Sequence, residues 1–301
     1  MQQSSGATHP SIERRTARPS AVADGRTSST PGGLAGIEMG LLALVYAVSV
    51  GSLVGFATFG LHPAMLARAQ VSAETYARML TWAPRAQILI AALALAAVLV
   101  RRVGGRWLAA FGAVYLVSLL AELAGTTVGL PFGPYRYTDG LGIKWFAHVP
   151  ALIPVSWFMM ALPSYAIAMR RFTRGGDGWL RIALGSFILL SWDLALDPAM
   201  SFATRYWIWG TAGPYYGMPI LNLAGWFVTG VALMVVFSVL HVERWLGDVP
   251  SSWLMAFYAA NLLLPVGMSV AVGLWGVVIA TGVAFAIAFA IARGMNRASF
   301  A

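Results

Sequence analysis

Long apolar stretches separated by short polar segments make up most of the chain after residue 33. A helix that crosses a membrane needs about 20 mostly apolar residues. We predict eight such spans: 36–59, 84–100, 107–130, 149–169, 179–199, 219–241, 252–270 and 273–293. The last two almost adjoin, so seven spans is the alternative, and the second is short unless it begins nearer Tyr76. The pattern predicts an all-α fold, a polytopic transmembrane helical bundle.

Residues 1–33 differ from the rest of the chain. They are polar, rich in Ser, Thr, Arg, Gly and Pro, and show no apolar periodicity, which is typical of disorder. The first apolar stretch begins too late, and is too long, for a signal peptide. We therefore predict a disordered cytoplasmic tail over 1–33 and a transmembrane helical domain over 34–301, with a functional site built around residues 120–230.

Composition and charge support the membrane prediction. The chain is 59% hydrophobic and 10% charged, whereas a globular domain carries about 25% charged residues. Its net charge of +9 comes from basic residues at the ends of apolar stretches, where they set the orientation of the spans in the membrane. The charge therefore does not indicate a nucleic-acid partner. With a cytoplasmic N-terminus, fourteen Lys and Arg lie on the inner side and six on the outer. The bias predicts a multi-pass protein of the cell membrane with its N-terminus inside.

Three carboxylates lie within predicted spans and near one membrane face: Glu122, Asp193 and Asp197. A charge at the bilayer centre costs roughly 2.5–3.5 kcal/mol on insertion scales, so such residues are functional candidates. Glu122 lies near the end of the third span and the two aspartates near the end of the fifth. Because these ends face the same side, the acids and the loops 130–146 and 201–219 are expected to converge there.

The spacing of the two aspartates predicts acid–base chemistry. Asp193 and Asp197 are four residues apart and therefore share a helix face. Two carboxylates this close in a low dielectric do not both ionise readily. The protonated one can donate a proton, and its ionised neighbour can orient or deprotonate a water. The alternative is a structural role, with Arg205 or Arg136 neutralising one acid. The four histidines and the absence of cysteine give no metal-binding motif, so no metal is predicted.

Aromatic side chains flank the acids in both loops and in the adjoining spans. An aromatic face stabilises a cation by about 0.5–2 kcal/mol when water is excluded. The alternative is the aromatic belt common at membrane interfaces. Asn222 could hold a water or a substrate oxygen, or simply link two helices. The predicted binding residues are Tyr135, Tyr137, Trp192, Trp207, Trp209, Tyr215, Tyr216, Asn222 and Trp226.

The two acid-bearing segments also show a weak internal similarity. Each is followed by Gly-Pro-Tyr, at 133–135 and at 213–215, and each next span carries a tryptophan, Trp157 or Trp226. An old duplication or chance would explain this equally.

Three segments resemble one family. They are Glu122-Leu-Ala-Gly-Thr-Thr-Val-Gly-Leu-Pro-Phe-Gly-Pro-Tyr-Arg-Tyr137, Ser191-Trp-Asp-Leu-Ala-Leu-Asp-Pro198, and Trp207-Ile-Trp-Gly with Gly213-Pro-Tyr-Tyr-Gly-Met-Pro219, Asn222 and Trp226. They are similar to the integral-membrane carotenoid hydratases, of the gamma-carotene 1′-hydratase and bisanhydrobacterioruberin hydratase type. The resemblance covers roughly residues 36–293 and is specific from about 120 to 230.

The resemblance implies a carotenoid 1,2-hydratase, an enzyme of carotenoid biosynthesis. Water adds across the terminal C1=C2 double bond of an acyclic carotenoid end group, such as that of lycopene or gamma-carotene, and gives a tertiary alcohol. No metal or organic cofactor is required. Asp193 or Asp197 is expected to donate the proton and Glu122 to orient the water, or the reverse. The expected partner is a carotenoid within the bilayer, and other enzymes of the same pathway could bind.

Two other functions remain open at this stage. A carotenoid end-group cyclase would begin with the same protonation but exclude water. A proton-coupled transporter would use the acids as a relay. The sequence favours an enzyme, because the acids gather at one face.

Overall fold

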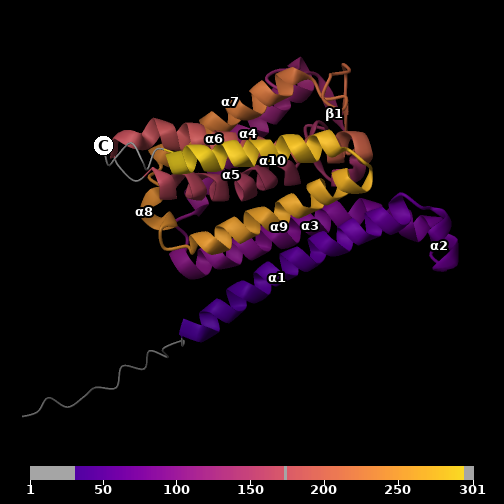
Figure 1. Cartoon of the computed structure of the whole chain (residues 1–301), viewed down its shortest axis with the longest axis horizontal. Helices are drawn as coiled ribbons and strands as arrows, with labels where there is room; N and C mark the ends of the chain where they lie inside the picture. Colours follow the sequence, from indigo (N-terminus) through magenta and orange to yellow (C-terminus); the bar gives the residue numbers. More distant parts are fainter. Residues whose placement is uncertain (1–30, 173–174, 295–301) are drawn as a thin grey trace, which may run out of the picture.

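The structure is a computed structural model that describes residues 31–172 and 175–294. Its helices lie side by side in one elongated bundle (Figure 1). The long helices are α1 (Pro31–Gly55), α3 (Ala73–Val103), α4 (Leu108–Val128), α5 (Leu152–Arg171), α6 (Gly178–Asp197), α7 (Ile220–Val239), α9 (Ser251–Ala271) and α10 (Trp275–Gly294). The predicted polytopic all-α bundle is confirmed.

Among the described residues, seven helices are long and apolar enough to cross a membrane. Two of them continue into π-helical turns: α1 into η1 (Phe56–Gly60) and α6 into η4 (Pro198–Ala203). A shorter apolar helix over Trp275–Ile291, part of α10, follows the seventh. The choice between seven and eight spans therefore depends on α10 alone.

Helix α3 begins well before residue 84, as the alternative start near Tyr76 predicts. The Ser72 side chain caps it by accepting a hydrogen bond from the Thr75 amide at 3.1 Å. Pro84 consequently lies inside the helix and does not start it. Neighbouring helices make such a proline tolerable in a membrane.

The predicted tail, residues 1–33, falls outside the described residues except for its last three, which open α1. Short elements fill the connections between the long helices. They are α2 (Ala64–Arg68), η2 (Asp139–Leu141), η3 (Gly175–Asp177) and α8 (Glu243–Leu246), with strands β1 (Tyr135–Tyr137), β2 (Lys144–Trp145), β3 (Val149–Pro150) and β4 (Trp207–Trp209).

Helix α6 lies at the centre of the bundle and contacts α5, α7, α9 and α10. Helix α1 packs on the outside, against α9 and α3. In Figure 1, β1 and α2 lie at one end of the bundle and α8 at the other. The two acid-bearing helices, α4 and α6, both end at the β1 end.

The two loops that follow the acid-bearing helices are joined as a small antiparallel sheet. Strand β1 pairs with β4, and the register sets Tyr135 opposite Trp209 and Tyr137 opposite Trp207. Segments about seventy residues apart in sequence thus form one cap over the ends of α4 and α6. Strand β2 pairs with β3 within the same end of the bundle.

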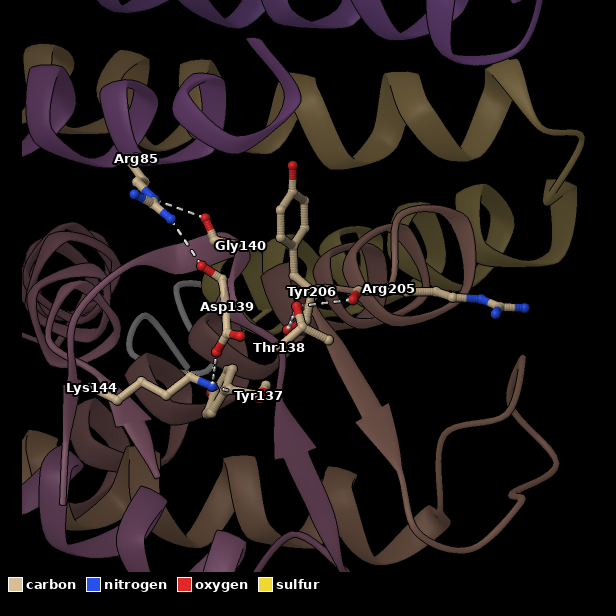
Figure 2. Close-up of polar contacts among 8 residues, drawn as sticks. All are labelled: Arg85, Tyr137, Thr138, Asp139, Gly140, Lys144, Arg205 and Tyr206. Atoms are coloured by element: carbon tan, nitrogen blue, oxygen red, sulfur yellow. Dashed lines mark hydrogen bonds and ion pairs between the residues drawn. The ribbon is translucent and has the colours of Figure 1, made fainter. Parts of the chain in front are cut away.

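Arg85 fastens this cap to helix α3 (Figure 2). Its guanidinium donates to the carbonyl oxygens of Gly140 at 2.9 Å and Asp139 at 2.8 Å. Lys144 bonds the Asp139 carboxylate at 2.7 Å, and this contact lowers the pKa of Asp139. Thr138 donates its hydroxyl to the Tyr206 carbonyl at 3.0 Å. These contacts of Arg85, Lys144 and Thr138 hold the loop in place and so fix the adjoining strand β1.

The first part of α1 is fixed by an ion pair whose carboxylate, that of Glu38, is buried. Glu38 accepts two hydrogen bonds from the Arg102 guanidinium of α3, each 2.6 Å long. Trp253 of α9 donates to the Glu38 carbonyl at 2.8 Å. Bidentate pairing of this kind is strong and specific in orientation, so it sets how α1 lies on α3 and α9.

Candidate active site

Three buried carboxyl groups gather under the β1–β4 cap. Glu122 comes from α4, and Asp193 and Asp197 from adjacent turns of α6. Their exposed fractions are 4%, 0% and 2%. A buried carboxyl group is tolerated only where hydrogen bonds replace its water, so their partners define what each can do.

Glu122 is surrounded by hydrogen-bond donors. The Trp157 indole of α5 donates to Oε1 at 2.8 Å. The Tyr137 hydroxyl donates to Oε2 at 2.8 Å, and the Tyr135 hydroxyl donates to the same oxygen. Three donors and no acceptor form an arrangement suited to an ionised carboxylate.

Both tyrosines are held as donors. Burial raises the pKa of the Tyr135 and Tyr137 hydroxyls well above the usual value, and the neighbouring Glu122 carboxylate raises it further. The phenols therefore keep their protons at any physiological pH. Their short spacing on β1 places both hydroxyls on the same carboxylate.

Asp197 is also bonded at both oxygens. The Trp207 indole of β4 donates to Oδ1 at 2.7 Å, and the Asn222 amide of α7 donates to Oδ2. The same amide nitrogen lies 3.1 Å from Asp193 Oδ2. Asn222 thereby bridges the two aspartates and fixes the orientation of both carboxyl groups.

Asp193 differs from the other two acids. Its Oδ1 is buried and faces no hydrogen-bond donor among the described residues, while its carboxyl lies within hydrogen-bonding reach of Asp197. A buried oxygen without a donor is costly when charged. Asp193 is thus the carboxyl best suited to carry a proton, and it can share that proton with Asp197.

A small cavity, here the acid cavity, opens between these groups. Glu122 and Asp197 line it, with Asn222 between them. The volume open to the centre of a water-sized sphere is ≈ 30 Å³. Since one water needs roughly 10–15 Å³ on that measure, the acid cavity has room for about two waters.

Aromatic rings form much of the cavity wall. Trp157 and Trp226 are stacked, with ring centroids 4.0 Å apart and planes at 21°. The Tyr135 ring lies 5.2 Å from that of Trp209, and the Tyr137 ring 5.8 Å from that of Trp207. A cation formed here would face several electron-rich surfaces and little water.

Most of the predicted site residues meet at this cavity. Those that line it are Glu122, Tyr135, Tyr137, Asp197, Trp207, Trp209, Asn222 and Trp226. Asp193 lies behind Asp197 and touches the site through Asn222. Trp192 lines an adjoining cavity instead, with its ring 5.9 Å from Trp226.

Tyr215 and Tyr216 do not line the acid cavity. The Tyr215 hydroxyl donates to the Leu194 carbonyl at 3.0 Å, and its ring packs on Tyr216. Tyr216 lies against Gly276 of α10. Both rings thus brace the loop after β4. Of the ion pairs formed by the described residues, none joins Arg136 or Arg205 to the three acids.

Trp157 is the main residue that sequence reasoning missed as a site residue. It bonds Glu122 and stacks on Trp226, its counterpart in the internal similarity. The similarity extends to the acids themselves. Glu122 and Asp197 each accept from an aromatic side chain on the following strand and from a side chain on the next helix. The internal similarity in the sequence did pair Trp157 with Trp226, but it gave no reason to expect that Trp157 binds Glu122.

No three acidic, histidine or cysteine side chains within residues 31–172 and 175–294 form a cluster that could hold a metal ion. The chemistry available at the site is that of carboxyl groups, phenols, indoles and an amide around a small cavity.

Comparison with known proteins identifies the family of the chain. A model of the family described as "carotenoid biosynthesis protein" matches residues 85–289, more than half of the chain. Bisanhydrobacterioruberin hydratase from Haloarcula japonica is 30% identical over 127 residues, which are 42% of this chain and 43% of that protein. The match thus spans less than half the length of that relative. No solved structure matches the chain. The similarity to bisanhydrobacterioruberin hydratase confirms the resemblance noted from the sequence, and the chain belongs to the carotenoid biosynthesis protein family.

Proposed function

We propose that the protein is a carotenoid 1,2-hydratase. It adds water across the terminal C1=C2 double bond of an acyclic carotenoid end group and leaves a hydroxyl on C1. The observation that carries the proposal is the acid cavity, where Asp197 and Glu122 face a water-sized space beneath aromatic rings. The hydratase relative supports the reaction class.

Asp197 donates the proton. It lines the cavity, and Asp193 behind it supplies a shared proton across the pair. The proton adds to C2, and the electron pair of the double bond forms the new C–H bond. The positive charge is left on C1 as a tertiary cation. Trp157 and Trp226 line the cavity beside it, and an aromatic face that meets a cation is worth about 0.5–2 kcal/mol.

Glu122 orients the water. Its carboxylate, fixed by Tyr135, Tyr137 and Trp157, accepts a hydrogen bond from the water that attacks C1. Loss of a proton from the bound water to a carboxylate of the site completes the tertiary alcohol. The net change is one alkene and one water to one alcohol, so no oxidant or reductant is needed.

The polar cavity favours hydration over the other two functions. A cyclase must keep water from its cation, whereas this space admits water beside two carboxyl groups. A proton-coupled transporter needs groups along a route to both faces. Here Glu122, Asp193 and Asp197 all lie near the C-terminal ends of α4 and α6, beneath the β1–β4 cap.

The test is expression in a host that makes an acyclic carotenoid, followed by mass analysis of the pigments. We expect products one water heavier, with the hydroxyl oxygen taken from isotopically labelled water. Asp197→Asn should lower turnover by about 10²–10⁴-fold, the usual contribution of a general acid. Asp248→Asn, at an exposed acid paired with Arg106, is the matched control and should retain activity. Isomers of unchanged mass would identify a cyclase instead, and an unaltered pigment profile with the protein in the membrane would refute both.

A further inference from the structure

The acid cavity does not stand alone. A second space, the middle cavity, shares Ile153, Leu196 and Trp207 with it as common walls. The middle cavity measures ≈ 90 Å³ on the same scale. Trp192, predicted as a binding residue, lines it. A ligand whose tip reached Asp197 would therefore continue into this space.

The middle cavity adjoins a larger one in turn. Pro84 of α3, Met200 of η4 and Leu264 of α9 line both the middle cavity and this outer cavity. The outer cavity measures ≈ 310 Å³ and is bounded by α1, α3, η4 and α9. The three spaces thus follow one another from the acids to the inner side of α1.

The walls change character along this path. Carboxyl groups line the acid cavity, but the residues that line the middle and outer cavities include no charged side chain among those described. The polar groups there are uncharged amides and hydroxyls, such as Gln87 and Asn261 in the middle cavity and Tyr76 and Thr204 in the outer one. Methionine, leucine and aromatic side chains provide most of the surface. Adaptable, apolar walls of this kind suit a hydrocarbon.

Two glycines of α1 keep the outer cavity open. A Cβ atom added at Gly51 or Gly55 would meet no heavy atom within 4 Å. The spacing Gly51-Ser-Leu-Val-Gly55 is the one that brings helices together in membranes. Among the described residues, however, no other helix packs closely against these two glycines. Both glycines line the outer cavity instead.

We propose that the outer and middle cavities bind the polyene arm of the substrate, and that Gly55 and Leu264 determine which chains can pass to the acids. The inference rests on the proposed hydration for its substrate. The occupant is a linear, uncharged isoprenoid chain, because it must be long enough to reach Asp197 from α1 and meets walls that are mostly apolar and carry no charged side chain among the described residues. Leu264 lines both cavities where they adjoin, and Gly55 lines the outer one.

Substitutions that fill the path test the proposal, and each has a matched control. Gly55→Leu fills the outer cavity, and Gly40→Leu makes the same change on α1 at a site that lines none of these cavities; neither new Cβ meets an atom within 4 Å. Leu264→Phe narrows the passage, while Leu263→Phe changes its neighbour, which lines none of the three cavities. Because leucine has a higher helix propensity than glycine, Gly55→Leu is expected to fold. If Leu264→Phe does not accumulate in the membrane, Gly55→Leu alone therefore tests the proposed path.

Bound polyene and hydrated product are measured separately on the full-length protein purified from an acyclic-carotenoid host. Polyene absorbance per protein should fall by about tenfold in Gly55→Leu and Leu264→Phe, since overpacking of this size typically costs one or more factors of ten. Both controls should stay within about twofold of wild type. Asp197→Asn should bind polyene normally and form hydrated product about 10²–10⁴-fold more slowly.

The outcomes distinguish the path from the chemistry. If wild type and Asp197→Asn both bind polyene but neither yields product, the hydratase proposal fails and the path stands. If Gly55→Leu and Leu264→Phe bind polyene as their controls do, the path is wrong whatever the reaction.

Discussion

At the scale of single residues, the three acids are made unequal by their partners. Glu122 accepts three hydrogen bonds, Asp197 accepts two, and one oxygen of Asp193 has no donor among the described residues. Environments that differ in this way separate proton donors from ionised groups. The proposed roles of Glu122 and the aspartate pair follow from that difference.

Replacing Glu122 by glutamine should damage both stability and activity. The amide NH₂ of Gln would face donors, so at least one of Tyr135, Tyr137 and Trp157 would lose its acceptor. An unsatisfied buried group costs about 1–3 kcal/mol, and loss of an acid–base group costs about 10²-fold or more in rate. Thermal unfolding in detergent and pigment mass analysis give the two values.

The control for this substitution is Glu74→Gln. Glu74 is exposed at the start of α3 and bonds only Arg78 of its own helix among the described contacts. It should change neither measurement by much. Equal behaviour of the two variants would contradict the role given to Glu122.

Tyr135 and Tyr137 should make stability depend on alkaline pH. Burial, and then the Glu122 carboxylate, raise the pKa of both phenols in the folded protein above the value of about 10 in an unfolded chain. Their contribution to stability is therefore complete below pH about 10, and it is lost as the pH rises through the folded pKa.

Tyrosinate absorbance at pH about 11 checks this expectation, as unshifted phenols would be mostly ionised there. The native wild type and the Tyr135→Phe/Tyr137→Phe variant should give the same signal, and only unfolding should add two phenolates to the wild type. A native wild type that already shows the two extra phenolates would refute the shift.

At the scale of elements, Phe132 ties the cap to the helices. A Cβ added at Gly125 of α4 would lie 2.8 Å from ring atoms of Phe132 and Tyr135, and one added at Gly225 of α7 would lie 2.7 Å from Phe132. The two glycines thus admit one ring between α4 and α7. That ring holds the start of β1, and with it the Tyr135 hydroxyl, in place.

Gly125→Ala should therefore displace Tyr135 from Glu122. Overpacking costs typically 1–3 kcal/mol, and we expect hydration to fall by about tenfold or more because a site displaced by 1 Å loses rate steeply. Gly112→Ala on the same helix adds a Cβ that meets nothing within 4 Å. It should be neutral or slightly stabilising. Pigment analysis and thermal unfolding of both variants provide the comparison, and similar losses in both would argue against the steric explanation.

The sequence predicts the helices and the convergence of Glu122 and Asp197 at one end of the bundle. It does not predict which side chains bind these acids. Apolar length alone gives the spans, and alternation across the membrane brings Glu122 and Asp197 to one end. The start of α3 was harder, because Pro84 and Arg85 resemble a boundary but lie within the helix. Arg85 serves the cap there, and its carbonyl partners lie more than fifty residues away.

The partners within the site depend on packing between distant segments. The pairing of β1 with β4 places Trp207 and Trp209 at the acid cavity, whereas Tyr215 bonds the α6 backbone and Tyr216 lies against α10. Residue type does not distinguish these aromatics. The outer cavity arises between α1, α3, η4 and α9, so no single stretch of sequence reveals it.

At the scale of the whole molecule, α1 both joins the bundle and borders a cavity. Its first half is fixed by the ion pair of Glu38 with Arg102. In its second half, the Ser49 hydroxyl donates to a backbone carbonyl of α9 at 3.0 Å, whereas Gly51 and Gly55 line the outer cavity. Helix α1 is therefore held against α9 and also forms one wall of the proposed polyene path.

The position of the acid cavity at one end of the bundle has a consequence for symmetrical carotenoids. A molecule with two reactive tips presents only one of them, because the rest of its length lies in the path towards α1. To react again it must detach and re-enter the other way round. Turnover on such a molecule is thus distributive: during a time course the mono-alcohol should rise first and the diol later, as chromatography of successive samples would reveal. A diol that forms from the outset without free mono-alcohol would mean that both tips are served in a single encounter.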